Sequence, residues 1–392
     1  MSDTDEILDS KDEEVNKLEY LIDKRRIDQR KYLILLTFLT IFFAIFAMGF
    51  GSSESLDFGK IIKIILGIDE PTDTQSVILL KYRLPRVLMA ILAGAALATA
   101  GALMQGSLGN PLVSPLTLGV ASGASLGAAL AIILGISVVG TDFSISLPSV
   151  DFSDFPFEIG EVTNYNLGDI IPNTMIVINT FAFSLIVVFI IIKLGELRGI
   201  SAESYILVGI AITFINGAIV QCLVYFATPQ QLAQLTHWSF GSVRRPDLET
   251  VLFVAVILGA IFPALLKYSW DLNTLALGGD DFAISTGVDP GALRKKILII
   301  SALATSIIVA FTGLIGFVGL AAPHIARLII GNDYRKLVPC SALIGALLVL
   351  VADTIGGTIF APVVLPVGIM LSILGGPFFL YLLLSKRGAA NG

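Results

Sequence analysis

The chain contains the stretch Arg86-Val-Leu-Met-Ala-Ile-Leu-Ala-Gly-Ala-Ala-Leu-Ala-Thr-Ala-Gly-Ala-Leu-Met-Gln105, in which no charged residue follows the first position. Its length matches the roughly 20 residues with which an α-helix crosses the hydrocarbon core of a bilayer. Small residues recur at helical spacing between Gly94 and Gly101. Such residues let helix backbones approach closely inside a membrane, where lipid supplies no hydrophobic drive for association. The stretch therefore predicts a membrane-spanning helix packed against other helices.

Similar apolar runs define the fold class of the whole chain. Of 392 residues, 55% are hydrophobic and 14% are charged, and the mean hydropathy is +0.87. Soluble domains carry roughly 25% charged residues, so this chain has too few polar side chains to coat a water-soluble globule. We expect an all-α, polytopic membrane bundle of about ten transmembrane helices. The runs cover approximately residues 33–51, 86–105, 115–139, 174–193, 203–226, 250–268, 295–312, 313–330, 337–356 and 366–385. Three glycines and Pro323 within the run 313–330 predict a span that is broken or tilted.

Charged residues separate the transmembrane domain from its tails. Residues 1–32 form an acidic and then basic tail, residues 33–386 the ten-helix domain, and residues 387–392 a short C-terminal tail. Lys and Arg are more frequent at the span ends on one side, which predicts that both termini are cytoplasmic in a cell-membrane protein. Residues 141–173 are then an extracytoplasmic insertion, expected to form a loop or a small hairpin.

Residues that can carry catalysis or bind a metal are few. The two histidines and two cysteines show no metal-ligand or nucleophile–base spacing, and no GxxxxGK[ST] phosphate-binding loop occurs. Asp353 lies deep in an apolar run, and an intramembrane acid is a functional candidate by default, although helix packing is an equal alternative. For His324, a structural hydrogen-bonded role is favoured over a proton relay. We expect no metal site, no cofactor bound by this chain, and no nucleic-acid partner.

Two segments are candidates for contact with other proteins. Arg83 and Arg86 flank Pro85 where a span begins, and an exposed pair of arginines there can bind carboxylates of a partner. The largest loop expected on the inner side contains residues 280–285, which can form a short helix that Gly287 ends. Such a helix on the inner surface is what a peripheral motor protein would grip. The segment comprises Gly278, Gly279, Asp280, Asp281, Phe282, Ala283, Ile284, Ser285 and Gly287.

Several motifs follow one another in a fixed order. The first are Arg83-Leu-Pro-Arg86, Gly94-Ala-Ala-Leu-Ala, Gly101-Ala-Leu-Met-Gln105, Asn110-Pro-Leu with Pro115, Leu118-Gly119, Gly123-Ala, and Trp238 with Gly241-Ser242. The most specific block is Gly316-Phe-Val-Gly-Leu, Pro323-His324, Arg327, Gly331, Asp333 and Arg335, followed by Pro339, Ala352-Asp353-Thr354, Leu365-Pro-Val-Gly368 and Gly376-Pro-Phe-Phe379. Together they resemble the type II permeases of ATP-binding cassette importers for iron-siderophores, haem and vitamin B12. The resemblance covers about residues 33–386 and leaves out the acidic tail and the insertion.

The resemblance implies a permease that works in a larger assembly. It implies a homodimer whose interface forms the translocation path, two separate cytoplasmic ATPase subunits that use ATP-Mg, and an extracytoplasmic substrate-binding protein. Arg83 and Arg86 match the positions that pair with glutamates of the binding protein, and residues 278–289 match the element that couples to the ATPases. The residues assigned to the translocation path or to helix packing are Gln105, Asn110, Pro111, Gly119, Gly123, Pro323, His324 and Asp353.

Three positions depart from the family pattern. Gly109 and Gly357 stand where the family usually has arginine, and Val364 stands where it usually has glutamate. The glycine at position 357 removes one expected contact to the binding protein.

The sequence thus favours an ATP-driven importer of a metal chelate, with an iron(III)-siderophore ahead of cobalamin, haem or molybdate as cargo. An ion-coupled secondary transporter, in which Asp353 and His324 form a relay, is the main alternative. A membrane-embedded enzyme has no credible set of catalytic residues in this chain.

Overall fold

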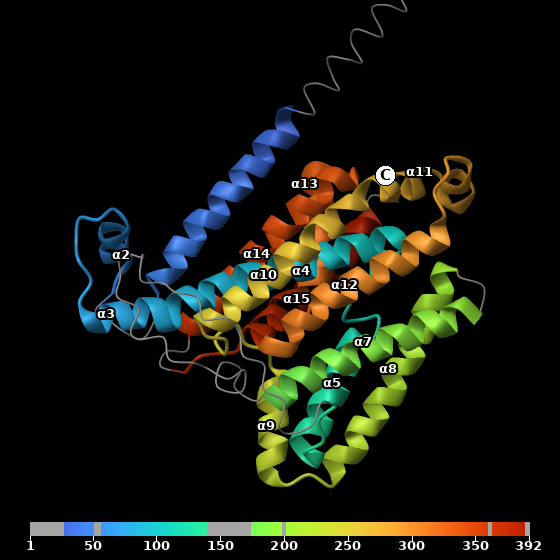
Figure 1. Ribbon diagram of the computed structural model, residues 1–392. Coiled ribbons are helices and arrows are strands. Elements are labelled where there is room, and N and C mark those ends of the chain that lie inside the picture. Colours follow the sequence, from blue (N-terminus) through green and yellow to red (C-terminus); the bar gives the residue numbers. More distant parts are fainter. Residues whose placement is uncertain (1–26, 51–55, 139–173, 198–200, 360–362, 389–392) are drawn as a thin grey trace, which may run out of the picture.

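The computed structural model describes residues 27–50, 56–138, 174–197, 201–359 and 363–388. Every regular element in these ranges is a helix, as the sequence predicts (Figure 1). The first 26 residues of the acidic and basic tail, the insertion 141–173 and the last four residues lie outside the described residues.

Ten apolar helices match the ten predicted spans. Seven are long and apolar enough to cross a membrane, and three are shorter. The long ones are Ile27–Met48, Asp73–Ser107, Thr174–Leu197 (α7), Ala202–Tyr225 (α8), Leu248–Ser285, Pro290–Thr312 (α12) and Tyr334–Thr358 (α14), and the shorter ones are Val120–Leu134, Val318–Ile330 (α13) and Val367–Phe378.

Several of these spans are composite. Asp73–Ser107 consists of α3 (Asp73–Val77), the π-helix η1 (Ile78–Arg83) and α4 (Leu84–Ser107), and Val120–Leu134 consists of α5 (Val120–Ala129) and the π-helix η2 (Leu130–Leu134). Leu248–Ser285 joins α10 (Leu248–Lys267) to α11 (Ser269–Ser285), and the last span is the first part of α15 (Val367–Gly388). Two short helices, α2 (Phe58–Ile65) and α9 (Pro229–Ser239), lie between spans.

Helix α4 lies at the centre of the bundle and contacts α10, α12, α13 and α14 (Figure 1). Its small residues bring backbones together: a Cβ atom on Gly94 would lie 2.2 Å from the carbonyl oxygen of Gly345 in α14. A Cβ atom on Gly101 would lie 1.9 Å from the carbonyl oxygen of Gly319 in α13. These contacts confirm the packing predicted from the small-residue pattern, because only glycine leaves room for the neighbouring backbone.

A second group of helices is built on the same principle. Helices α5, α7, α8 and α9 form the group coloured teal to yellow-green in Figure 1. Helix α5 packs on α7 through glycines, since a Cβ atom on Gly123 would lie 2.6 Å from the carbonyl oxygen of Phe183, and one on Gly127 would lie 2.4 Å from that of Asn179. Helix α12 contacts both α4 and α7 and so connects the two groups.

The span predicted to be broken is broken at its start. Helix α12 ends at Thr312, and Gly313 has a φ angle of +76°. Residues 313–317 are not helical, and α13 begins only at Val318. A Cβ atom on Gly313 would lie 2.2 Å from the carbonyl oxygen of Trp238, so the C-terminal end of α9 lies here directly against the backbone of Gly313. The glycines in this stretch therefore serve close approach as well as chain direction.

The contact between α4 and α14 gives a stability prediction. Gly94→Ala places a methyl group against backbone that cannot move aside, and overpacking of this kind costs about 1–3 kcal/mol. We expect a lower thermal midpoint of the detergent-solubilised protein, measured by size-exclusion chromatography after heating. Gly259→Ala is the matched control, because no atom lies within 4 Å of the added Cβ in α10. An equal midpoint for the two variants would contradict the close helix contact.

Candidate functional site

Helix α4 carries polar groups of interest at both of its ends. Arg83 and Arg86 lie at its N-terminal end, and Gln105 and Ser107 lie at its C-terminal end. Arg86 and Ser107 are 21 positions apart, which corresponds to about 32 Å of α-helix. The two ends are therefore separate sites joined by one rigid element.

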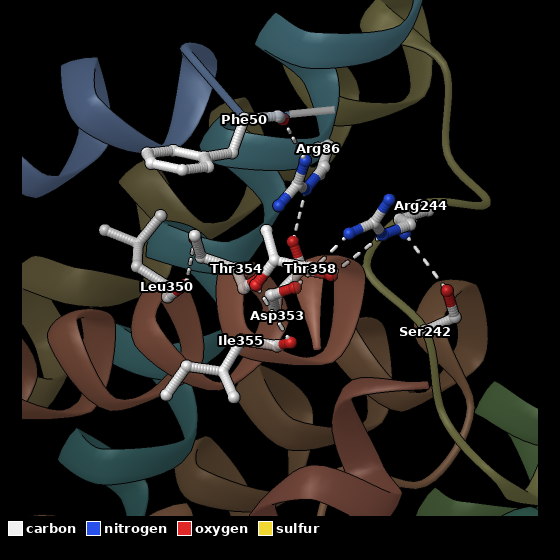
Figure 2. Close-up of polar contacts among 9 residues, drawn as sticks. All are labelled: Phe50, Arg86, Ser242, Arg244, Leu350, Asp353, Thr354, Ile355 and Thr358. Atoms are coloured by element: carbon white, nitrogen blue, oxygen red, sulfur yellow. Dashed lines mark hydrogen bonds and ion pairs between the residues drawn. The ribbon is translucent and has the colours of Figure 1, made fainter. Parts of the chain in front are cut away.

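At the N-terminal end, three charged side chains form a buried cluster that we call the ion triad: Arg86, Asp353 and Arg244 (Figure 2). Nε of Arg86 donates to Oδ2 of Asp353, and Nε of Arg244 donates to Oδ1 at 3.0 Å. Nη2 of Arg244 also donates to the backbone carbonyl oxygen of Asp353 at 3.2 Å. Arg86 is 5% exposed and Asp353 is 3% exposed. The carboxylate is thus enclosed by two guanidinium groups from different elements.

The two arginines at the start of α4 are buried, so the expectation of an exposed pair is wrong. Arg83 is 4% exposed, and its Nη1 donates to the carbonyl oxygens of Met48 at 2.6 Å and Leu56 at 2.7 Å. Nη1 of Arg86 donates to the carbonyl oxygen of Phe50 at 3.1 Å (Figure 2). The chain after the first span therefore folds back over both arginines, and the pattern around Pro85 gives no sign of this.

Arg244 was not among the residues singled out from the sequence. It lies in the loop between α9 and α10, where its backbone N–H donates to Oγ of Ser242 at 3.2 Å. A Cβ atom on Gly357 would lie 2.2 Å from Nη2 of Arg244. The guanidinium group of Arg244 therefore occupies the space that any larger side chain at position 357 would need. This gives the glycine at that position a physical reason.

The neighbouring Arg245 does not bind Asp353; it binds backbone carbonyl groups that hold the α9–α10 loop in place. Its Nη2 donates to the carbonyl oxygen of His237 at 2.5 Å, and its Nη1 donates to that of Thr312 at 3.3 Å. The N–H of Ser242 donates to the same Thr312 carbonyl oxygen at 2.7 Å. The loop that carries Arg244 is thus bound to the end of α12.

At the C-terminal end of α4, the predicted short helix is present. Within α11, Gly279 has φ +71° and ψ −160°, which separates residues 280–285 as a helical turn of their own. Gly287, with φ +86°, follows this turn. The side chains of Phe282 and Ile284 are exposed. The segment therefore presents an apolar surface at this end of the bundle.

A second charged contact, which we call the Arg294 clamp, connects this short helix to α4. Nη1 and Nη2 of Arg294 donate to the two carboxylate oxygens of Asp280 at 2.8 and 2.5 Å. Nε of the same arginine donates to the carbonyl oxygen of Ser107 at 2.9 Å. A bidentate guanidinium–carboxylate pair is among the strongest and most directional contacts available to side chains. One arginine thus joins the short helix to the end of α4.

The turn between α13 and α14 binds α11 at the same end. Nδ2 of Asn273 donates to Oδ1 of Asp333 at 2.7 Å, and Oδ1 of Asn273 accepts the N–H of Tyr334 at 2.8 Å. Hydrogen bonds from Arg335 lower the pKa of Asp333 to about 2, so this carboxylate is ionised at any physiological pH. The guanidinium of Arg335 also lies 4.5 Å from the ring centre of Trp270.

The other candidates for a translocation path lie in packing contacts or turns. Oε1 of Gln105 accepts a hydrogen bond from Nη1 of Arg327 at 2.6 Å, and Oδ1 of Asn110 accepts the N–H of Leu112 at 2.9 Å. Gly119 and Gly123 pack on α7, Pro323 is buried in α13, and His324 is half-buried. The exposed Pro111 follows Asn110 in the turn after α4. The path role of these residues stays a prediction.

A mostly apolar cavity between α5 and α8 also contains polar side chains that the sequence analysis missed. Its volume is about 360 Å³, and Ser122, Ser125, Thr213 and Gln221 contribute to its wall. Nδ2 of the buried Asn216 donates to Oγ of Ser122 at 3.0 Å at its edge. The sequence does carry a signal for this cavity. Two predicted spans have uncharged polar side chains at helical spacing, and these could have indicated it.

Within the described ranges, no group of three or more His, Cys, Asp or Glu side chains could hold a metal ion.

The model of the FecCD transport family matches residues 39–385. The chain belongs to this family.

Individual relatives agree with the family assignment over nearly the full length. An ABC transporter permease protein of Methanocaldococcus jannaschii is 38% identical, over 93% of this chain and 96% of that protein. The hemin transport system permease protein HmuU of Yersinia pestis is 35% identical, over 92% of this chain and 98% of that protein. A solved metal-chelate type ABC transporter in an inward-facing conformation has a TM-score of 0.72 at 28% identity, covering 91% of this chain and 99% of that chain. This FecCD-family protein is thus a membrane-spanning transport permease.

Two of the three departures from the family pattern have a visible environment. Gly109 adopts φ +58°, a left-handed conformation that favours glycine over an arginine, and Gly357 lies under Arg244. Nothing in the structure explains Val364.

The ion triad predicts the effect of neutralising its carboxylate. Asp353→Asn leaves Arg86 and Arg244 close together without a counter-charge, and breaking a buried ion pair in this way costs about 3–5 kcal/mol. We expect a thermal midpoint several degrees below that of the native permease. Glu249→Gln, which neutralises an exposed acid, is the control and changes stability by less than about 0.5 kcal/mol. An unchanged midpoint for Asp353→Asn would show that the carboxylate is not the structural counter-ion described here.

Proposed function

We propose that this permease is the membrane-spanning subunit of an ATP-driven importer for a metal chelate, with both termini in the cytoplasm. The observation that carries the proposal is the family match over residues 39–385, because it includes every span that bears the two sites of α4. The chain contains no GxxxxGK[ST] loop. ATP-Mg is therefore bound and hydrolysed by separate ATPase subunits, and this chain itself performs no covalent chemistry and binds no cofactor.

The coupling surface for the ATPases is the short helix 280–285. Its exposed Phe282 and Ile284 give a partner an apolar anchor, and hot spots of protein interfaces are commonly anchors of this kind. The Arg294 clamp then carries the displacement from Asp280 to the backbone of Ser107. Gly278, Gly279, Asp281, Ala283, Ser285 and Gly287 complete the proposed element.

The proposed transport role includes a homodimer in which two copies of α8 face each other. Helix α8 is predominantly apolar and largely exposed, yet it also exposes Gln221, which lines the α5–α8 cavity with Ser125 and Thr213. Polar groups of this kind are unfavourable against lipid tails, so this face is better placed against protein or water. Facing copies would enclose a path with uncharged, mostly apolar walls that carry a few polar side chains, through which a bulky ligand passes with weak contacts.

The cargo is proposed as a metal chelate, with an iron(III)-siderophore ahead of haem and cobalamin. One relative is a hemin permease, and the solved structure is of the metal-chelate type. The α5–α8 cavity has a mostly apolar wall with a few hydroxyl and amide groups and, among the described residues, no carboxylate, which suits a bulky chelate better than a bare cation, because a cation would need carboxylate ligands.

The rival function, an ion-coupled transporter with an Asp353–His324 relay, has less support. Arg86 binds Asp353 and Gln105 binds Arg327, and these two positions of α4 are separated by about 28 Å of helix. His324 lies one helical turn from Arg327, so the two proposed relay groups are near opposite ends of the bundle.

Purification of the tagged permease from its native membranes in mild detergent tests the proposed function. We expect a soluble subunit with a phosphate-binding loop, at one copy per permease. Ile284→Asp removes the apolar anchor and should reduce this subunit at least tenfold. Ile68→Asp changes an equally exposed isoleucine at the other end of α4 and should leave it unchanged. A permease that is active in uptake but free of any such subunit would favour the secondary transporter.

A further inference from the structure

The ion triad has one more positive than negative charge. Two guanidinium groups, of Arg86 and Arg244, share the single carboxylate of Asp353. No other ion pair of either arginine is present among the described residues. A net charge of +1 in a largely desolvated site is unfavourable unless a further anionic group completes it. The triad is therefore an incomplete site that suits one additional carboxylate.

Within the triad, only the Arg244 side chain is accessible to such a carboxylate. The side chains of Arg86 and Asp353 are 6% and 5% exposed, whereas that of Arg244 is 27% exposed. Its Nε and Nη2 are bonded to Asp353, but Nη1 has no hydrogen-bond partner in the part of the chain that the structure describes. Figure 2 shows Phe50 to the upper left of Asp353, Arg86 above its carboxylate and Arg244 to the upper right. A partner can thus reach one free guanidinium nitrogen whose orientation is already set.

Three neighbours keep Arg244 in this orientation. Gly357 adds no side chain where Nη2 lies, so the guanidinium rests against the backbone of α14. Arg245 and Ser242 bind the loop to the carbonyl oxygen of Thr312. Because the cation is held before a partner arrives, little side-chain entropy is lost when a carboxylate binds it.

We propose that Arg244 receives an acidic side chain of the extracytoplasmic substrate-binding protein, and that Gly357 keeps its place open. The inference deepens the proposed function and rests on it. Arg86 and Asp353 act as positioning residues, because Arg86 binds one carboxylate oxygen while the other orients Arg244. Arg83 serves the same end of the bundle by binding the carbonyl oxygens of Met48 and Leu56.

The test measures the affinity of the purified binding protein of the same transport system for the permease–ATPase complex in nanodiscs of zwitterionic lipid. Arg244→Gln should weaken binding at least about tenfold at low ionic strength and flatten its dependence on salt. Lys63→Gln is the matched control: it removes one exposed positive charge from α2, at the same end of α4 but outside the triad, and should change the affinity less than about twofold. An Arg244→Gln variant that binds as tightly as the Lys63→Gln variant overturns the inference.

A second pair of variants uses the contact between positions 244 and 357. Gly357→Arg alone should weaken docking, because its Cβ atom meets the guanidinium of Arg244. The double variant Arg244→Gly/Gly357→Arg carries the cation on α14 instead, beside the same carboxylate, and should recover affinity to within a few-fold of the native complex. The double variant also provides a test if Arg244→Gln fails to fold. A correctly folded double variant that still binds tenfold more weakly than the native complex contradicts the inference.

Different results would contradict the importer assignment and the role of Arg244. If the native complex contains the ATPase subunit but binds no extracytoplasmic protein, the importer assignment of the proposed function is wrong. If the native complex binds that protein and loss of Arg244 has no effect, the importer assignment stands and the role of Arg244 is wrong.

Discussion

The backbone of α4 lies directly against the backbones of α14 and α13, at the pairs Gly94–Gly345 and Gly101–Gly319. In lipid, association of helices depends on packing of this kind and not on a hydrophobic drive. Two such contacts along one helix determine both its distance from its neighbours and its rotation about its own axis. The rotation, in turn, directs Arg86 toward Asp353 at one end and places the Ser107 carbonyl next to Arg294 at the other.

This arrangement makes α4 a connection between two charged sites about 32 Å apart, the ion triad and the Arg294 clamp. Each site ties α4 to other elements: the triad to α14 and the α9–α10 loop, the clamp to α11 and α12. A transporter of this kind is a bistable element whose two states are biased by ligands at either end. A partner that binds Arg244 and a partner that binds residues 280–285 therefore act on the same rigid helix from opposite directions.

The elements that sequence reasoning predicted are those with local signals. Apolar length gave the ten spans, the glycine spacing near Gly94 and Gly101 gave the close packing, and Gly287 marked the end of the short helix at 280–285. The break before α13 followed from its glycines in the same way. In each case the cause lies within a few residues of the effect.

The ion triad could not be read from local pattern, because its members are far apart in the chain. Arg86 and Arg244 lie 267 and 109 positions from Asp353, and only the packing of α4 on α14 brings them together. Arg83 and Arg86 were expected to be exposed, but the chain after the first span covers them, and they bind its carbonyl oxygens instead. A buried acid at the end of one span, together with arginines expected at the same membrane face, is a signal that could have suggested an ion pair, but it does not say which arginines take part. The sequence alone did not explain why glycine stands at position 357; the structure explains it by placing the guanidinium group of Arg244 there.

If α4 couples the two ends of the bundle energetically, binding at one end must change the affinity at the other. The affinity of the binding protein for the permease–ATPase complex would be measured with and without a non-hydrolysable ATP analogue, for the native chain and for Arg294→Gln. We expect the nucleotide to change this affinity by at least fivefold in the native complex, and Arg294→Gln to remove most of the change while leaving the nucleotide-free affinity as it was. The same nucleotide-dependent change in both proteins, with the ATPase bound equally, would contradict this coupling.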